Sequence, residues 1–194
     1  MMDPQTRTVC WTPTWNPRHD SVGLEHLLLG DGEADSTILA IDEEHGPFRL
    51  TYHLTWDTSW QLRTAELCVK TERFAGLLSL ETDGQGRWQH RGGSAIDELD
   101  GCRDIDIWPT PFTNSFPIRR EPMEAGERRL FRMAWINALD LTFHAQPQAY
   151  TRRSDSLYLF ENLDGTGFRA ELPVDNAGIV LDYPELFRRV KSGQ

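Results

Sequence analysis

Two aspartates in the segment Leu99–Arg120 are spaced so that they could act together on one ligand. Asp104 and Asp106 are two residues apart, so an extended chain directs both carboxylates to the same face. At a rise of ~3.3 Å per residue, their Cβ atoms would lie roughly 6.5–7 Å apart. This spacing suits shared contact with sugar hydroxyls, one divalent cation held by oxygen ligands, or the acid and base of glycoside hydrolysis. The alternative is an acidic strand face in solvent.

The residues after this pair predict a break in the strand and then a short helix. Asn114 or Ser115 can cap a helix that continues to about Arg120. Three prolines prevent a continuous sheet ladder here, because each removes a backbone donor: Pro109, Pro111 and Pro117. Thr113 lies close enough in sequence to join a polar pocket formed by the aspartates.

Arg119 and Arg120 close the segment with two positive charges. Consecutive helical residues point about 100° apart, so the two arginines cannot share one role. A group of buried aspartates without a compensating charge would be costly. We therefore expect Arg119 to face the aspartates, and Arg120 to face solvent or a partner subunit.

A second candidate group consists of Asp57, Trp60 and Arg63. The segment Phe48–Val69 is too long for one strand, so the sequence predicts a bend at Thr55–Ser59 that brings Asp57 to a rim. Aspartate with tryptophan is a common way to hold a sugar, through hydrogen bonds and an apolar ring face. The alternative is a turn aspartate, a core tryptophan and a surface arginine.

Alternation of apolar and polar residues dominates the rest of the chain. Phe48–Trp56 changes at every step, which is typical of a half-buried strand. Similar strands are expected at 65–69, 77–81, 130–136, 139–143, 157–160 and 168–174. A second helical turn is expected at Glu185–Val190, where an acidic residue leads and basic residues follow. No linker divides the chain, so residues 1–194 are expected to form a single, mostly β domain.

Several motifs resemble a bacterial family described as putative glycolipid-binding proteins. The central motif joins Asp104-Ile-Asp106, Thr110–Asn114 and Pro117–Arg120. Further matching blocks are Tyr52–Asp57 with Trp60 and Arg63, Asp83-Gly84 with Gly86 and Trp88, and Asp175 with Gly178, Val180 and Asp182–Pro184. The resemblance implies a large, curved antiparallel sheet, similar to a β-roll, wrapped around one short α-helix. It also implies a glycolipid ligand and a homodimer.

Composition narrows the class of partner and the compartment. A formal net charge of −10 opposes binding to nucleic acid or to an anionic membrane surface. The apolar run Leu27–Leu29 is far shorter than the ~20 residues of a spanning helix, so no stable membrane insertion is expected. The three cysteines have no paired spacing, which favours a reducing cytoplasm. The histidines follow no metal or triad spacing, and no metal or other cofactor is expected.

Together these features predict a soluble, non-catalytic binding protein with the polar head of a glycolipid or related glycoconjugate in an acidic pocket. The expected ligand contacts are Asp57, Trp60, Arg63, Asp104, Asp106, Thr113 and Arg119. The alternative is a carbohydrate-active hydrolase that uses two of the aspartates as acid and base. A purely structural or regulatory dimer is a third possibility.

Overall fold

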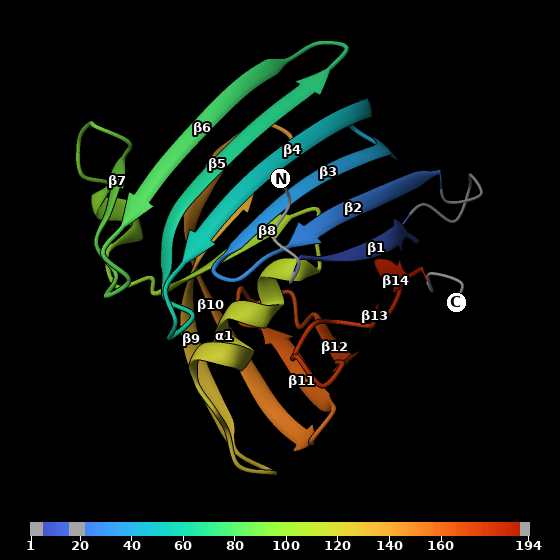
Figure 1. Cartoon of the computed structure of the whole chain (residues 1–194), viewed down its shortest axis with the longest axis vertical. Helices are drawn as coiled ribbons and strands as arrows, with labels where there is room; N and C mark the ends of the chain where they lie inside the picture. Colours follow the sequence, from blue (N-terminus) through green and yellow to red (C-terminus); the bar gives the residue numbers. More distant parts are fainter. Residues whose placement is uncertain (1–5, 16–21, 191–194) are drawn as a thin grey trace.

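A computed structural model describes residues 6–15 and 22–190, which form two β-sheets with one short helix between them (Figure 1). The larger sheet has nine strands in the order β13-β14-β1-β2-β3-β4-β5-β6-β7, and all neighbours are antiparallel. Its strands are β1 (Arg7–Pro13), β2 (Gly23–Leu29), β3 (Glu33–Asp42), β4 (Gly46–Trp56), β5 (Leu62–Thr71), β6 (Ala75–Thr82), β7 (Trp88–His90), β13 (Asp182–Tyr183) and β14 (Phe187–Arg189).

The smaller sheet has five strands in the order β12-β11-β10-β9-β8. Its strands are β8 (Asp104–Trp108), β9 (Arg128–Asn137), β10 (Thr142–Ser154), β11 (Leu157–Asn162) and β12 (Arg169–Pro173). Only β8 and β9 run parallel, because the chain between them crosses over through the helical segment. That segment comprises the 3₁₀ turn η2 (Phe112–Asn114) and helix α1 (Ser115–Arg120), and another 3₁₀ turn, η1 (Asp97–Leu99), precedes β8.

One hydrophobic core connects both sheets and the helix. In β4 every second side chain points inward, so Leu50 and Leu54 are fully buried. Phe116 of α1 is also fully buried, as are Ile105 of β8 and Ile136 of β9. The helix therefore packs against both sheets (Figure 1).

The predicted fold class is confirmed: the chain is mostly β, and a curved antiparallel sheet wraps around one short α-helix. Helix α1 is where the sequence predicted it, with Pro117 in its first turn, but Asn114 makes no capping hydrogen bond through its side chain. The bend between β4 and β5 is also confirmed, with Trp60 in a left-handed conformation (φ 59°) at its end. The expected domain of residues 1–194 includes residues 1–5, 16–21 and 191–194, which lie outside the described part.

Two local expectations were wrong. Glu185–Val190 is not a helical turn, because Phe187–Arg189 forms β14 and pairs with β1. Phe187 is 4% exposed, so tertiary pairing outweighed the helical charge pattern. The strand expected at 139–143 begins only at Thr142, since Leu141 has a positive φ of 62° in the preceding turn.

Candidate functional site

Asp104 and Asp106 lie on the face of β8 that is directed toward the helical segment. Their partners come from α1 and η2, respectively. Ile105 and Ile107, which alternate with the two aspartates along β8, are 0% and 1% exposed on the other face. The alternation predicted for this strand is therefore present, but the two aspartates have different surroundings.

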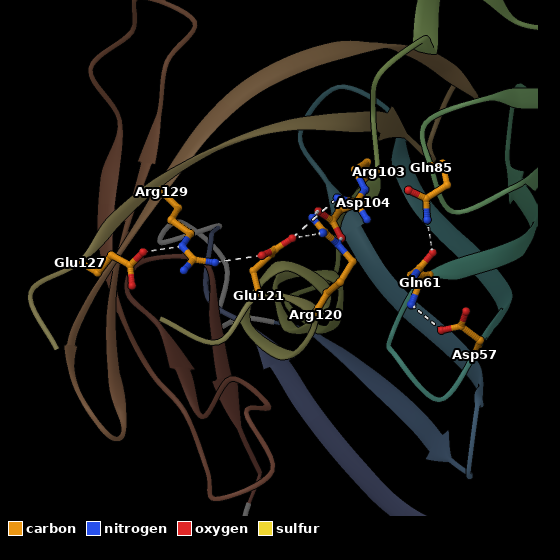
Figure 2. A network of polar contacts seen from close by, with 9 residues as sticks. All are labelled: Asp57, Gln61, Gln85, Arg103, Asp104, Arg120, Glu121, Glu127 and Arg129. Carbon is orange, nitrogen blue, oxygen red and sulfur yellow. Dashed lines mark hydrogen bonds and ion pairs between the residues drawn. The ribbon is translucent and has the colours of Figure 1, made fainter. Parts of the chain in front are cut away.

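Asp104 forms a buried ion pair with Arg120 (Figure 2). Arg120 Nε donates to Oδ1 at 2.8 Å, and its Nη2 donates to Oδ2 at 2.6 Å. The exposed fractions of the two side chains are 6% for Arg120 and 1% for Asp104. Burial acts to lower the pKa of Arg120, but the bonds to Asp104 outweigh it and raise the pKa. Such a fork-to-carboxylate pair fixes α1 to the start of β8.

The prediction that Arg119 faces the aspartates was wrong: Arg120 does. Thr113, which contacts Asp106, and Arg120 are seven residues apart, which is about two helical turns. They therefore share one side of the helical segment, while Arg119 points elsewhere. Its Nη1 donates to the Ala177 carbonyl at 3.1 Å, and its guanidinium lies 5.0 Å from the ring centre of Trp60. This seven-residue spacing from Thr113 is the signal in the sequence that could have identified Arg120 as the inward arginine.

A cavity of about 220 Å³, here called the aromatic cavity, lies between the five-stranded sheet, the segment that leads into α1, and strands β13 and β14 of the larger sheet. Asp106 lines it, together with the polar side chains Thr110, Asn114, Gln148 and Asn162. Six aromatic residues also line it: Trp108, Trp135, Phe160, Phe168, Tyr183 and Phe187. Flat apolar rings combined with amide and carboxylate groups are suited to holding a small polyhydroxylated ring.

Asp106 is the single carboxylate that lines the aromatic cavity among the described residues. Thr113 donates a long hydrogen bond of 3.3 Å to its Oδ1, and Gln148 Nε2 donates to its Oδ2 at 2.6 Å. Burial raises the pKa of Asp106, and the hydrogen bonds from Gln148 and Thr113 oppose that shift only in part. Thr113 is itself fully buried, so its hydroxyl orients Asp106.

The second predicted group, Asp57, Trp60 and Arg63, lies at the turn between β4 and β5. Arg63 Nη2 donates to Asp57 Oδ2 at 2.6 Å, and the backbone N–H of Ser59 donates to Oδ1. The backbone N–H of Gln61 also donates to Oδ1 (Figure 2). Desolvation acts to raise the pKa of Asp57, but these bonds outweigh it and lower the pKa. The carboxylate of Asp57 is thus used to hold the turn.

Trp60 contributes to a different hollow, here called the tryptophan cleft, of about 310 Å³. Its ring stacks on Trp56 with centres 4.9 Å apart, and Arg119 covers it. Trp56, Trp60 and Arg119 all line the cleft. The seven predicted contacts are therefore distributed over separate regions of the molecule, and their roles in ligand binding stay predictions.

Sequence reasoning missed a buried acid, Glu25 of β2. Its Oε1 accepts hydrogen bonds from Tyr52 at 2.5 Å, Thr110 at 2.8 Å and Ser36 at 3.0 Å. Burial raises its pKa to about 7, although these three bonds act to lower it. Thr110 also lines the aromatic cavity, so Glu25 supports the wall of that cavity. The signal in the sequence was its position two residues before the buried residue Leu27, which places both side chains on the inner face of β2.

Within residues 6–15 and 22–190, no three His, Cys, Asp or Glu side chains gather into a metal-binding group. The cysteines Cys10, Cys68 and Cys102 are free. The same part of the chain contains no helix long and apolar enough to cross a bilayer.

Comparison with known proteins identifies the family. The model of the family described as "Putative glycolipid-binding" matches residues 8–189. The chain belongs to this family. A similar solved structure is the crystal structure of a DUF1089 family protein from Pseudomonas aeruginosa, with 47% identity and a TM-score of 0.86. The match covers 89% of this chain and 95% of that one. Among proteins with curated descriptions, none matches.

Proposed function

We propose that the protein binds the polar head of a glycolipid or related glycoconjugate in the aromatic cavity, without catalysis. Membership of the glycolipid-binding family supports the ligand class. The lining of the cavity supports its location, because aromatic faces and hydrogen-bonding groups from three sides surround one small volume.

One atom carries the proposal. Gln148 Oε1 is buried and has no hydrogen-bond partner among the described residues. The amide nitrogen of the same side chain is fixed by Asp106, which leaves the oxygen as a free acceptor on a residue that lines the cavity. A buried acceptor without a partner costs about 1–3 kcal/mol. A sugar hydroxyl that donates to Gln148 Oε1 would remove this cost.

The size of the cavity indicates which part of an amphiphile enters. About 220 Å³ is below the ~300 Å³ at which sites for larger ligands begin, so the cavity suits a single ring. Phe168 lines the cavity and is 37% exposed. It would provide an apolar rim for the first carbons of an alkyl chain that remains outside.

Alkyl glycosides below their micelle concentration are suitable probes, measured by isothermal titration calorimetry. We expect Asp106→Asn to weaken octyl glucoside or octyl galactoside binding about tenfold, as for the loss of one charged hydrogen bond. Asn at this position can donate to Gln148 Oε1 and thereby occupy the free acceptor. Native mass spectrometry after exposure to lipid extracts then identifies natural amphiphiles retained by the protein.

Asp35→Asn is the matched control, because Asp35 is exposed on the nine-stranded sheet. It should bind as the wild type does. Equal affinity of the Asp106→Asn and Asp35→Asn variants, or failure of the wild type to retain any glycoside or extracted lipid, would refute the proposal.

A hydrolase is the competing function, and the raised pKa of Asp106 is the observation in its favour. Its expected partner, Asp104, is engaged through both oxygens by Arg120 and is buried. This arrangement favours binding over acid–base catalysis. Turnover of chromogenic glycosides with a bell-shaped pH profile, lost in Asp106→Asn, would instead establish the hydrolase.

We also propose that the protein acts as a homodimer in the cytoplasm. The family resemblance supports the dimer, and the free cysteines fit a reducing compartment. Light scattering after size-exclusion chromatography measures the oligomeric state, and a monomer at micromolar concentration would contradict the dimer.

A further inference from the structure

A third hollow, here called the arginine cleft, lies beside the aromatic cavity but has its own walls. It has a volume of about 520 Å³ and lies between β9, the end of α1 and the segment before β8. β8 pairs with β9 only from Met133 onward, so Arg128–Arg132 has no strand on the side that borders the cleft. The arginine and aromatic cavities share no lining residue.

The charge of this cleft is opposite to that of the whole chain. Its lining includes five arginines: Arg103, Arg120, Arg128, Arg129 and Arg132. Asp104 and Glu121 are the two acids that line it, and Glu127 and Glu161 pair with Arg129 and Arg128 at its edge, so the formal charge is five minus four, or +1, in a chain of −10. Because like charges repel at close range, such a cluster is costly unless an anion lies among them.

Glu121 already occupies the position of such an anion (Figure 2). Its carboxylate accepts from Arg129 Nη1 at 2.9 Å and from Arg120 Nη1, and it lies 3.8 Å from Arg103 Nη1. One carboxylate thus serves three guanidinium groups. Arg120, Arg128 and Arg129 each have a carboxylate partner other than Glu121. Arg103 and Arg132 are therefore the arginines of the cleft without a carboxylate at hydrogen-bond distance among the described residues.

Arg103 and Arg132 provide the donors for a ligand. Arg103 Nε is buried and has no hydrogen-bond partner within residues 6–15 and 22–190. Arg132 is exposed and is positioned by its bond from Nε to the Asp100 carbonyl, at 3.0 Å. The guanidinium fork matches the oxygens of phosphate, and here arginines approach from a loop, a helix and a strand.

We propose that the arginine cleft binds the phosphoryl group of a phosphorylated sugar or polyol. Arginines from several directions suit a tetrahedral oxyanion with a double charge. The volume also leaves room for the carbon part of the ligand, which would contact the exposed side chain of Leu130. This ligand site is additional to the aromatic cavity and does not depend on it.

Calorimetric titration with inorganic phosphate, glycerol 3-phosphate and glucose 6-phosphate tests the site, with glycerol and glucose as uncharged controls. We expect Arg103→Gln and Arg132→Gln each to weaken binding of the phosphate esters about tenfold. Glu121→Gln should tighten it several-fold, because the competing carboxylate is removed. Added salt should weaken binding in the wild type.

Arg49→Gln is the matched control, since Arg49 is exposed on the nine-stranded sheet and is not part of the cleft. Thermal melting verifies that each variant is folded. The proposal is overturned if Arg49→Gln and Arg132→Gln bind equally well, if Glu121→Gln does not bind more tightly, or if neither a soluble phosphate ester nor a vesicle containing phosphatidic acid binds in preference to its control.

Vesicles distinguish the source of the phosphoryl group. Binding to phosphatidylcholine vesicles that contain phosphatidic acid, without binding of the soluble esters, would assign the group to a lipid; the reverse would assign it to a free metabolite. Either result supports the site if Arg132→Gln weakens the observed binding. The absence of both kinds of binding overturns the proposal. Arg132→Gln should leave alkyl glycoside binding unchanged, which separates this test from that of the aromatic cavity.

Discussion

The inner faces of the two sheets differ in the polarity of their buried side chains. In the nine-stranded sheet, these positions hold fully buried apolar residues such as Leu50, Leu54 and Leu67. In the five-stranded sheet they hold Asp104 on β8 and Gln148 on β10, which are both 1% exposed. The inner face of the five-stranded sheet thus combines buried polar and apolar side chains, whereas the inner positions of β4 and β5 are apolar.

A polar interior requires partners from elsewhere, whereas an apolar one only requires close packing. The helical segment supplies them: Arg120 neutralises Asp104, and Thr113 orients Asp106. Gln148 Oε1 and Arg103 Nε are two of the six buried side-chain atoms without partners in the described part of the chain, and they lie on side chains that line hollows where ligands could act.

The largest effect is expected from breaking the ion pair in the polar interior. Asp104→Ala removes the buried carboxylate from Arg120 and leaves it with Glu121 alone, which should lower the free energy of unfolding by about 3–5 kcal/mol. Urea denaturation followed by tryptophan fluorescence measures it. A loss below about 1 kcal/mol would mean that the polar interior contributes no more than a surface ion pair does.

Glu25 is a buried carboxyl group in the nine-stranded sheet, and its contribution to stability depends on pH. Burial raises its pKa from 4.5 to about 7, so between these values the folded state retains a proton that the unfolded state has lost. Stability should therefore fall as the pH rises through this window and level off above it, with a loss on the order of 3 kcal/mol. Glu25→Gln keeps an acceptor for Tyr52 and carries no charge.

We expect the Glu25→Gln variant to unfold with a free energy that depends less on pH, and to be more stable than the wild type at pH 8. Urea denaturation from pH 5 to pH 8 provides the comparison. Parallel curves for the two proteins would show that Glu25 does not titrate in this range.

The smallest effect is expected from the two arginines at the end of α1. Arg120 faces the five-stranded sheet, and Arg119 faces Trp60. Arg120→Lys loses the fork that holds Asp104 in the five-stranded sheet and should cost about 1–3 kcal/mol. Arg119→Lys retains a charge near Trp60 and should cost less than about 1 kcal/mol. The melting temperature should fall more in Arg120→Lys than in Arg119→Lys. Equal shifts would remove the distinction between the two sides of the helix.

The fold was largely predictable because its information is local. Alternation in Phe48–Trp56 identified a strand, and the prolines with Asn114 identified the helix start. The family resemblance then supplied the arrangement of these elements. The error at Phe187 arose because its strand exists through pairing with β1, which local sequence does not encode.

The site was less predictable because its partners are distant in sequence. The spacing of Asp104 and Asp106 correctly placed both on one face, yet it could not show that Arg120 holds one and Gln148 the other. Glu25 could have been found from its phase with Leu27. The arginines of the cleft gave no sequence motif, since they come together only through the crossover between β8 and β9.

The pairing of β14 with β1 also has a consequence for synthesis on the ribosome. Trp11 pairs with Arg189, so the first strand of the chain receives one of its neighbours only after almost the whole chain has been made. Until then, one edge of β1 lacks a strand and can pair with another chain. Contacts between such distant residues also slow folding. Translation through Arg189 is thus a requirement for completing the larger sheet, and nascent chains stalled before it are the species most exposed to aggregation.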